Sequence, residues 1–359
     1  MMFMLLGCLS LYAADNDLIT RQITIQLEKA GTLPDRIGSS RKYTITNLKI
    51  IGEINGTDLR MIREMAGSNS TGNSTDGMLS VLDLSEAKIV EGGDCYYKDH
   101  YTSNDVIGSH AFSYCSGLTS LNLPDGITEI GNNVFYGCSG LTSLTLPAGI
   151  TSIGSRAFYG CSGLTSLNLP DGITSIGDCA FIDCSGLTSL NLPAGITKIG
   201  WHAFDGCSGL TSLTLPAGIT SIGIGAFYGC RRLTSLTLPD GIIWIAPDAF
   251  NGCFGLTSIY VYAEKVPLIG GNAFAGVDVK KCTVYVPMGT RDDYRLSGFG
   301  DYFENIVEFE ATGIDKTTTS TEVEEVARYS VNGQRLSAPT KGLNIVKYSD
   351  GSVKKVAVR

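Results

Sequence analysis

Cysteine is the residue type in this sequence whose spacing most directly suggests chemistry. The chain has 11 cysteines, and seven of them recur with a constant period of 23: Cys115, Cys138, Cys161, Cys184, Cys207, Cys230 and Cys253. Thiols that lie together can bind a metal ion or form disulfides. No Cys-x-x-Cys pair and no nearby His supplies a compact ligand set, and seven thiols in one column cannot all pair. The spacing therefore predicts a column of buried free thiols that pack as small hydrophobic groups, with no metal and no cofactor.

The histidines and carboxylates do not suggest a catalytic site. None of His100, His110 and His202 has a Ser or Cys and an Asp at a spacing typical of a triad. The adjacent carboxylates at 292–293 and 324–325 fall in segments that we expect to be solvated, and the glycines belong to turns rather than to a phosphate-binding loop. A glycan-processing enzyme would need two inward-facing carboxylates on a cleft, so it is the least favoured function.

A sequence repeat with the same period must position the cysteines. The segment 118–140, LTSLNLPDGITEIGNNVFYGCSG, is followed by the near copy LTSLTLPAGITSIGSRAFYGCSG. The same period carries a leucine from Leu118 to Leu256 and a phenylalanine from Phe112 to Phe250. A fixed period of this length is typical of a solenoid, in which each unit buries its apolar face only against its neighbours. We therefore predict a repeat solenoid over residues 79–287.

Each repeat is expected to contain one strand and one tight turn. Leu118, Leu121 and Leu123 alternate with polar residues as in a half-buried strand, which Pro124 ends. The two isoleucines of the following Gly-Ile-x-x-Ile-Gly segment also point inward, and the Ala-Phe-x-x-Cys segment favours a short helical or 3₁₀ turn.

Composition excludes one class of partner. Apolar residues make up 43% of the 359 residues, enough for a continuous core, whereas charged residues make up only 17%. The net charge is −8. A nucleic-acid-binding protein needs a basic face to neutralise phosphates, so we expect no nucleic-acid partner.

The residues before the solenoid differ in composition. Residues 1–14, MMFMLLGCLSLYAA, resemble a secretory signal that is too short to span a membrane. Alternatively, the Leu-Leu-Gly-Cys run resembles a lipobox, which would make Cys8 a lipid anchor. Residues 15–78 are predicted to cap the solenoid, with a degenerate rung at 45–50 and a short amphipathic helix over Thr57–Ala66 that has Thr57 as its N-cap.

The first unit of the solenoid carries an insertion. The step from Leu79 to Leu118 exceeds the regular period of the leucines, so 16 residues loop out. The loop contains Tyr96, Tyr97 and Tyr101, and insertions in repeats often carry binding residues. The tyrosines either form an exposed binding loop or fold back onto the solenoid flank.

The C-terminal residues are predicted to form three further segments. Residues 288–310 are rich in charged and aromatic residues and suit a cap, and the Thr/Glu-rich residues 311–327 suit a linker. Residues 328–359 suit a small β module with hairpin turns at Asn332-Gly333 and Asp350-Gly351.

Binding must use positions at which the copies differ. The outward strand positions are nearly always Thr, Ser and Asn, a uniform face with no aromatic hot spot. Two more variable columns hold Lys198, Trp201, His202 and Trp244, which would form one patch on a flank, and a further column holds three tyrosines, Tyr136, Tyr159 and Tyr228. Exposed Trp and Tyr are favoured at interfaces. Alternatively, these residues reflect drift at positions where packing exerts no constraint.

The repeat LxxLxLPxGIxxIGxxAFxxC resembles the BspA-like (Treponema-type) leucine-rich repeats of bacterial surface proteins over residues 79–287. This resemblance implies a solenoid with a parallel β-sheet, a location outside the cytoplasm, and adhesion to host proteins or other cells. The tail segments YSVNGQRL (329–336) and KGLNIV (341–346) are similar to the end of a type IX secretion sorting domain, although the tail is short. That similarity implies a secreted or outer-membrane-associated protein of a Gram-negative bacterium.

Two non-enzymatic hypotheses remain. The favoured one is an extracellular scaffold that uses its repeat surface to bind a host matrix, mucin or cell-surface protein or glycan. The alternative is a structural or decoy surface protein without a specific ligand, which the near-identity of the copies would suit.

Overall fold

The computed structural model describes residues 18–310, 325–330, 335–336, 342–348 and 353–358. The signal-like segment with Cys8, most of the predicted linker and both predicted hairpin turns of the tail lie outside these residues. The chain divides into two compact units, Met1–Glu310 and Ala311–Arg359. Within the described residues, no helix combines the length and apolarity that crossing a membrane requires.

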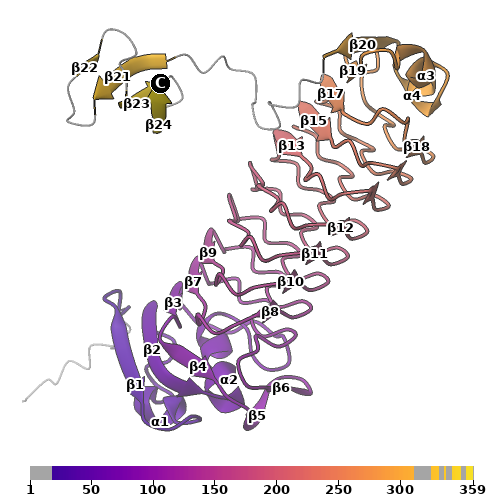
Figure 1. The fold of residues 1–359 in the computed structure, drawn as a ribbon. Coiled ribbons are helices and arrows are strands. Elements are labelled where there is room, and N and C mark those ends of the chain that lie inside the picture. The colour runs from indigo at the N-terminus through magenta and orange to yellow at the C-terminus, as the bar shows by residue number, and fades with distance from the viewer. Residues whose placement is uncertain (1–17, 311–324, 331–334, 337–341, 349–352, 359) are drawn as a thin grey trace, which may run out of the picture. The chain divides into compact units, whose positions relative to one another are not determined.

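The first unit is a solenoid whose rungs, one per repeat, stack through two strips of parallel strands (Figure 1). The first strip contains the Leu-x-x-Leu-x-Leu strands. Its first part pairs in the order β1 (Ile23–Leu27), β2 (Asn47–Ile54), β3 (Val81–Asp83), β7 (Ser120–Asn122) and β9 (Ser143–Thr145), with β4 (Ala87–Ile89) also beside β2. Its second part pairs in the order β13 (Ser212–Thr214), β15 (Ser235–Leu238), β17 (Ser258–Val261), β19 (Thr283–Pro287) and β20 (Asn305–Phe309). An isolated parallel bridge between Asn168 and Asn191 lies between the two parts.

The second strip contains the Ile-Gly segments. The sequence analysis predicted that their isoleucines point inward, but it did not predict strands there. It pairs β8 (Glu129–Ile130), β10 (Ser152–Ile153), β11 (Ser175–Ile176), β12 (Lys198–Ile199), β14 (Ser221–Ile222), β16 (Trp244–Ile245) and β18 (Leu268–Ile269) in that order.

The expected register is confirmed across the rungs. Leu48 pairs with Leu82, Leu82 with Leu121, and Leu121 with Leu144, so the degenerate rung at 45–50 joins the same leucine column. β1 adds another rung before it, with Ile23 beside Leu48. The repeat solenoid with parallel strands therefore extends further towards the N-terminus than the leucine repeat itself.

The phenylalanine column forms a continuous stack in the core. The rings of Phe158 and Phe181 are 4.9 Å apart and only 6° from parallel, and the stack runs from Phe112 to Phe274. Phe274 comes one position later than the regular period after Phe250 would place it. Their rings nevertheless stack at 5.4 Å, because the extra residue lies between β17 and β18, outside the core column.

A helix follows β2, and its N-cap is not the expected residue. Helix α2 runs from Gly56 to Met65, and Asn55 is the N-cap, because its side chain accepts from the Thr57 N–H while Asp58 accepts from the Asn55 N–H. The prediction of Thr57 as the cap was therefore wrong. The buried Asp58 carboxylate also accepts from the Leu33 N–H, which joins α1 (Leu33–Ile37) to α2.

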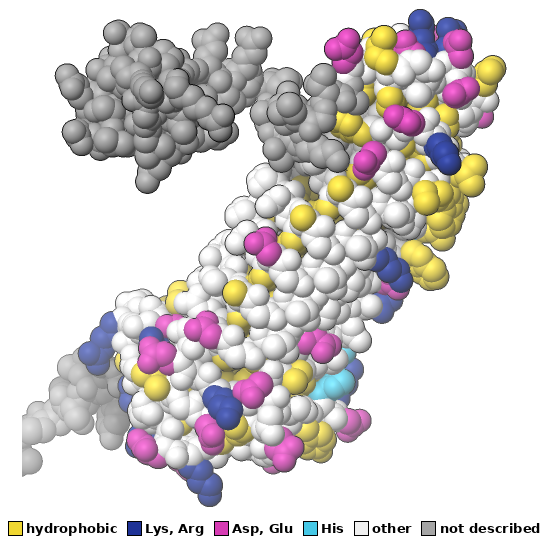
Figure 2. All heavy atoms as spheres, in the orientation of Figure 1, with side chains coloured by type: hydrophobic (Ala, Val, Ile, Leu, Met, Phe, Trp, Pro, Cys, Tyr) yellow, Lys and Arg dark blue, Asp and Glu magenta, His cyan; other side chains and the backbone are white. Residues whose placement is uncertain are grey.

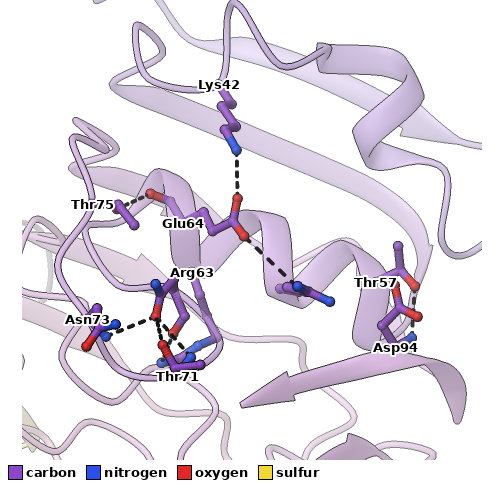
Figure 3. Close-up of polar contacts among 10 residues, drawn as sticks. Lys42, Thr57, Arg63, Glu64, Thr71, Asn73, Thr75 and Asp94 are labelled. Carbon is purple, nitrogen blue, oxygen red and sulfur yellow. Dashed lines mark hydrogen bonds and ion pairs between the residues drawn. The ribbon is translucent and has the colours of Figure 1, made fainter. Parts of the chain in front are cut away.

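The outer side of α2 makes further polar contacts (Figure 3). Lys42 Nζ lies 2.7 Å from Glu64 Oε2, and the Asp94 N–H donates to Thr57 Oγ1. Asp94 belongs to β5 (Gly92–Tyr97), which pairs with β6 (His100–Thr102) as an antiparallel hairpin. The insertion is thus a hairpin packed on α2 rather than an irregular loop.

At the other end, short helices cover the last ring of the stack. Helices α3 (Arg291–Arg295) and α4 (Gly298–Tyr302) precede β20. The rings of Phe299 and Phe303 lie 6.0 and 5.2 Å from Phe274, and the Tyr294 hydroxyl donates to the Ala263 carbonyl at 2.6 Å. This end of the aromatic core is therefore shielded from water.

The second unit contains one antiparallel sheet with the order β22 (Arg335–Leu336), β21 (Glu325–Ser330), β23 (Gly342–Tyr348) and β24 (Val353–Val358). Its first strand, β21, begins at Glu325, whereas the sequence analysis placed the start of the β module at residue 328.

Candidate binding surface

The second strip presents an outward row of side chains that changes along the solenoid. Each two-residue strand points its first side chain outward and its second inward, as Lys198 and the buried Ile199 of β12 show. The strand register aligns the outward row: Glu129, Ser152, Ser175, Lys198, Ser221, Trp244 and Leu268. The structure therefore brings Lys198 and Trp244 into one row, with Ser221 between them.

Trp201 and His202 lie in the turn that follows β12. The Trp201 N–H donates to Asp178 Oδ1 at 2.9 Å, while the indole is 60% exposed. His202 Nδ1 lies 3.0 Å from Asp205 Oδ2, a carboxylate whose pKa is raised chiefly by burial. The His202 N–H donates to the carbonyl of Ile224, which places Trp201 next to the following rung.

Five exposed hydrophobic side chains in these rungs form what we call the apolar patch. It consists of Trp201, Ile224, Ile243, Trp244 and Leu268, which are 60, 36, 64, 43 and 71% exposed. Trp244 pairs with Leu268 across the strip, and the Leu268 N–H donates to the Ile243 carbonyl. Figure 2 shows hydrophobic side chains gathered on the side of the solenoid that carries β16 and β18. Exposed apolar side chains grouped in this way are typical of interaction sites, which makes this patch the candidate binding surface.

Sequence reasoning found only part of this patch. It identified Trp201 and Trp244 as site residues, but it did not include Ile224, Ile243 or Leu268. Ile243 stands where Thr128, Thr151 and the later copies have a threonine, so a comparison of copies at that column would have found it. Leu268 lies beyond the one-residue slip, and its place beside Trp244 becomes clear only from the strand register.

The three tyrosines of the insertion do not form one exposed surface. The Tyr96 hydroxyl donates to the Ser109 carbonyl at 2.8 Å, and the Tyr97 ring stacks on His110 at 4.8 Å. Tyr96 and Tyr97 are therefore buried against the solenoid flank, and only Tyr101, at 58% exposure, faces solvent. The exposed-loop interpretation was wrong for Tyr96 and Tyr97.

A buried arginine explains why the hairpin folds back. The Arg63 guanidinium lies 4.6 Å from the centre of the Tyr97 ring. Its two terminal nitrogens also donate to the carbonyls of His110, Ala111 and Ser113, so backbone oxygens rather than a carboxylate accept its hydrogen bonds. Stacking on Tyr97 adds a cation–π contact to a charge that is removed from water.

The remaining tyrosine column is split along the solenoid. The Tyr136 and Tyr159 rings stack at 4.7 Å, and the 43% exposed Tyr114 contacts Tyr136 edge-on. Tyr228 is 42% exposed and stands apart from this stack, because the two intervening rungs carry Ile182 and Asp205 at the same position.

One His–Ser pair resembles the base and nucleophile of a catalytic site, but the hydrogen bond between the two side chains runs in the opposite direction. His110 Nδ1 lies 3.0 Å from Ser113 Oγ, which donates to the Asn133 carbonyl at 2.6 Å. Because the hydroxyl proton points to that carbonyl, His110 must donate to Ser113 rather than accept its proton. Ser113 is also fully buried, so the pair cannot present a nucleophile to a substrate.

Six of the seven thiols in the cysteine column donate a hydrogen bond to the preceding rung, whereas the Cys115 thiol lies 3.9 Å from the Ser113 carbonyl of its own rung. The thiol of Cys161 donates to the Phe135 carbonyl at 3.2 Å, and five other rungs repeat this contact. Burial is the main cause that raises the pKa of Cys161 well above its usual value. All ten cysteines in the described part of the chain are free thiols. Among the same residues, no group of three or more His, Cys, Asp or Glu side chains is placed to hold a metal ion.

Comparison with known proteins identifies the repeat. The model of the BspA type leucine rich repeat region matches residues 105–223 and 176–290, with six copies. None of the curated proteins compared with the chain matches it.

Solved structures of bacterial leucine-rich repeat proteins are also similar. A leucine-rich repeat protein from Bacteroides ovatus is 27% identical with a TM-score of 0.47, over 59% of this chain and 57% of that one. The T. pallidum leucine-rich repeat protein is 28% identical with a TM-score of 0.41, over 54% of this chain and 89% of that one. A leucine-rich cell surface protein from Faecalibacterium prausnitzii is 22% identical with a TM-score of 0.36, over 83% and 91%. The chain thus spans little more than half of the B. ovatus protein.

Proposed function

Because the chain belongs to the BspA-type leucine-rich repeat family, we propose that it is a non-enzymatic scaffold outside the cytoplasm that binds a matrix or cell-surface protein through the apolar patch. The observation that carries this proposal is the concentration of Trp201, Ile243, Trp244 and Leu268 on an otherwise polar strip. Aromatic and large aliphatic side chains at the centre of an interface supply most of its binding energy.

The contrast between rungs supports the same proposal. In the earlier rungs of the second strip, the outward row holds Glu129, Ser152 and Ser175, and its threonine neighbours are unchanged. The hydrophobic replacements occur only in rungs that adjoin one another. Random drift would not favour adjacent hydrophobic replacements over isolated ones.

An array of extracellular-matrix proteins, mucins and cell-surface proteins, probed with the purified chain, tests the proposal. The Trp201→Ser/Trp244→Ser/Leu268→Ser variant should lose at least about tenfold in affinity, because interface anchors contribute about 2 kcal/mol or more when truncated. Met78→Ser is the matched control, since Met78 is 48% exposed near the N-terminal cap and its loss should not matter.

Two results would overturn the proposal. If the triple variant still binds, the binding site lies elsewhere on the solenoid. The absence of any bound protein on the array would favour the alternative of a structural surface component without a specific ligand. Cell fractionation, with detection of the chain at the surface or in the medium, tests the proposed location separately.

A further inference from the structure

The outward row of the first strip ends in aromatic residues. In successive rungs, one strand position holds Asn122, Thr145, Asn168, Asn191, Thr214 and Thr237. The register continues this row directly into Tyr260 and Tyr285, which pair with Thr237 and with each other. The expectation that this face has no aromatic hot spot was therefore wrong, because it considered only the regular copies.

Four rings at the end of the row form what we call the aromatic corner. Tyr260 and Tyr285 stack at 4.6 Å and 8°, and the Phe309 ring stands edge-on to Tyr260 at 6.2 Å and to Tyr262 at 5.2 Å. All four side chains are partly exposed. Tyr285 covers one face of the Tyr260 ring, while the other face looks along the row to the much smaller Thr237. Tyr260 therefore forms an end wall for the row.

The polar groups of the row are available to a ligand. A column of threonines precedes the row in the strand segments, and their hydroxyls bond to the neighbouring rung. The Thr142 hydroxyl, for example, donates to the Thr119 carbonyl of the preceding rung. By contrast, in the described part of the chain the side chains of the row from Asn122 to Thr237 make no hydrogen bond, and most are exposed. They are donors and acceptors that repeat at the strand spacing of about 4.8 Å.

The row from Asn122 to Thr237 carries no charged residue. The charged residues in line with it lie before it, at the N-terminal end, where Lys49 Nζ is 3.4 Å from Asp83 and 2.6 Å from Glu86. Figure 2 shows that the middle of the solenoid bears few charged side chains on the visible face. A chain of net charge −8 would in addition repel an anionic polymer. These features match an uncharged ligand.

We propose that the row and the aromatic corner bind a neutral polysaccharide chain laid along the solenoid axis. One sugar presents its C–H face to the Tyr260 ring, whose negative face attracts such hydrogens. The hydroxyls of the following sugars hydrogen-bond to Thr237, Thr214 and Asn191. A polypeptide would need pockets for its side chains or an open strand edge, whereas this row offers only a repeated hydroxyl and amide pattern. The inference does not depend on the apolar patch, which lies on the other strip.

Affinity electrophoresis of the full chain in gels that contain a soluble β-glucan, a mannan, a xylan or a dextran tests this inference. At least one of these polysaccharides should retard the wild-type chain. Tyr260→Leu removes the ring but keeps apolar bulk, and it should weaken the association about fivefold or more. Thr214→Val replaces an exposed hydroxyl by a methyl group of the same size, leaves the fold intact and should weaken it about threefold.

The controls separate this site from the patch and from other ligands. The Trp244→Ser variant should be retarded like the wild type, because Trp244 belongs to the apolar patch and not to this site. Polysaccharide binding can therefore be observed even if the protein-binding proposal fails. Heparin and hyaluronan should not retard the chain at physiological salt. The inference is overturned if no neutral polysaccharide retards the chain, if only the anionic ones do, if retardation survives both Tyr260→Leu and Thr214→Val, or if these substitutions abolish binding of a protein instead.

Discussion

The thiol of Cys184 donates a hydrogen bond to the carbonyl of Phe158, 3.1 Å away in the preceding rung. The same carbonyl accepts the N–H of Cys161 at 3.1 Å, which closes the tight turn of its own rung. Each such oxygen therefore has two donors, one within its rung and one from the next. The cysteine column thus links neighbouring rungs at a buried position where a simple hydrophobic side chain would only fill space.

Substitution of one column cysteine should destabilise the solenoid modestly. Cys184→Ala removes the thiol donor and leaves a small void, so we expect a loss of about 1–2 kcal/mol in the free energy of unfolding. Equilibrium urea unfolding followed by circular dichroism measures it. Cys179→Ala is the matched control, since Cys179 is only half-buried, makes no hydrogen bond through its side chain within the described residues and should change stability by less than about 0.5 kcal/mol. Equal losses for the two variants would show that the thiol contact has no structural importance.

The phenylalanine stack should transmit damage between rungs. Phe181 lies between Phe158 at 4.9 Å and Phe204 at 5.1 Å, so Phe181→Ala opens a cavity in the middle of the stack and should cost about 3–5 kcal/mol. Hydrogen exchange should show faster opening of the rungs on both sides of residue 181, because each rung is stabilised by its neighbours. Phe254→Ala, at a 58% exposed position, should leave exchange unchanged. Faster exchange confined to the mutated rung would contradict the coupling.

The regular part of this fold was predictable because its register follows directly from the repeat period. Leu121 pairs with Leu144 because equal spacing places equal residues side by side. The burial of Tyr97 was not predictable, since it depends on Arg63 from a helix outside the repeat and on a hairpin with no second copy. The apolar patch was half predictable: Trp244 stood out as a large residue in a column of small ones, whereas its neighbour Leu268 required the register across the one-residue slip.

One surface column adopts a backbone conformation that most side chains resist. His110, Asn133, Arg156, Cys179 and His202 all have φ between 50° and 62°. Left-handed φ is tolerated by Gly and Asn but strains a residue such as Arg.

Arg156→Gly should therefore stabilise the solenoid by about 0.5–1 kcal/mol, since relief of this strain outweighs the added flexibility of the unfolded chain. Thermal unfolding of the variant measures the gain. The matched control is Ser155→Gly, at the preceding position, where φ is not positive and glycine should destabilise by a similar amount. If both variants lose stability, the Arg156 conformation carries no strain.

The hairpin should make stability depend on pH through His110. Burial, together with the nearby His100, Arg63 and Lys98, lowers the pKa of His110 to about 4 from its usual 6.5. Between these two values the unfolded chain binds a proton that the folded chain does not, so stability falls as the pH is lowered from about 6.5 towards 4. We expect this group to contribute about 1–2 kcal/mol across that window, after allowance for its partial exposure.

Urea unfolding at pH 7 and pH 4.5 checks the effect. His110→Asn should flatten the pH dependence, because asparagine does not titrate and tolerates the left-handed backbone at this position, where φ is 62°. The variant should also be less stable at pH 7, since it loses the stacking of the imidazole on Tyr97. Arg156→Asn, in the same left-handed column, removes no group that titrates in this range and should keep the wild-type dependence. If Arg156→Asn flattens the profile as much as His110→Asn does, the acid sensitivity does not arise from His110.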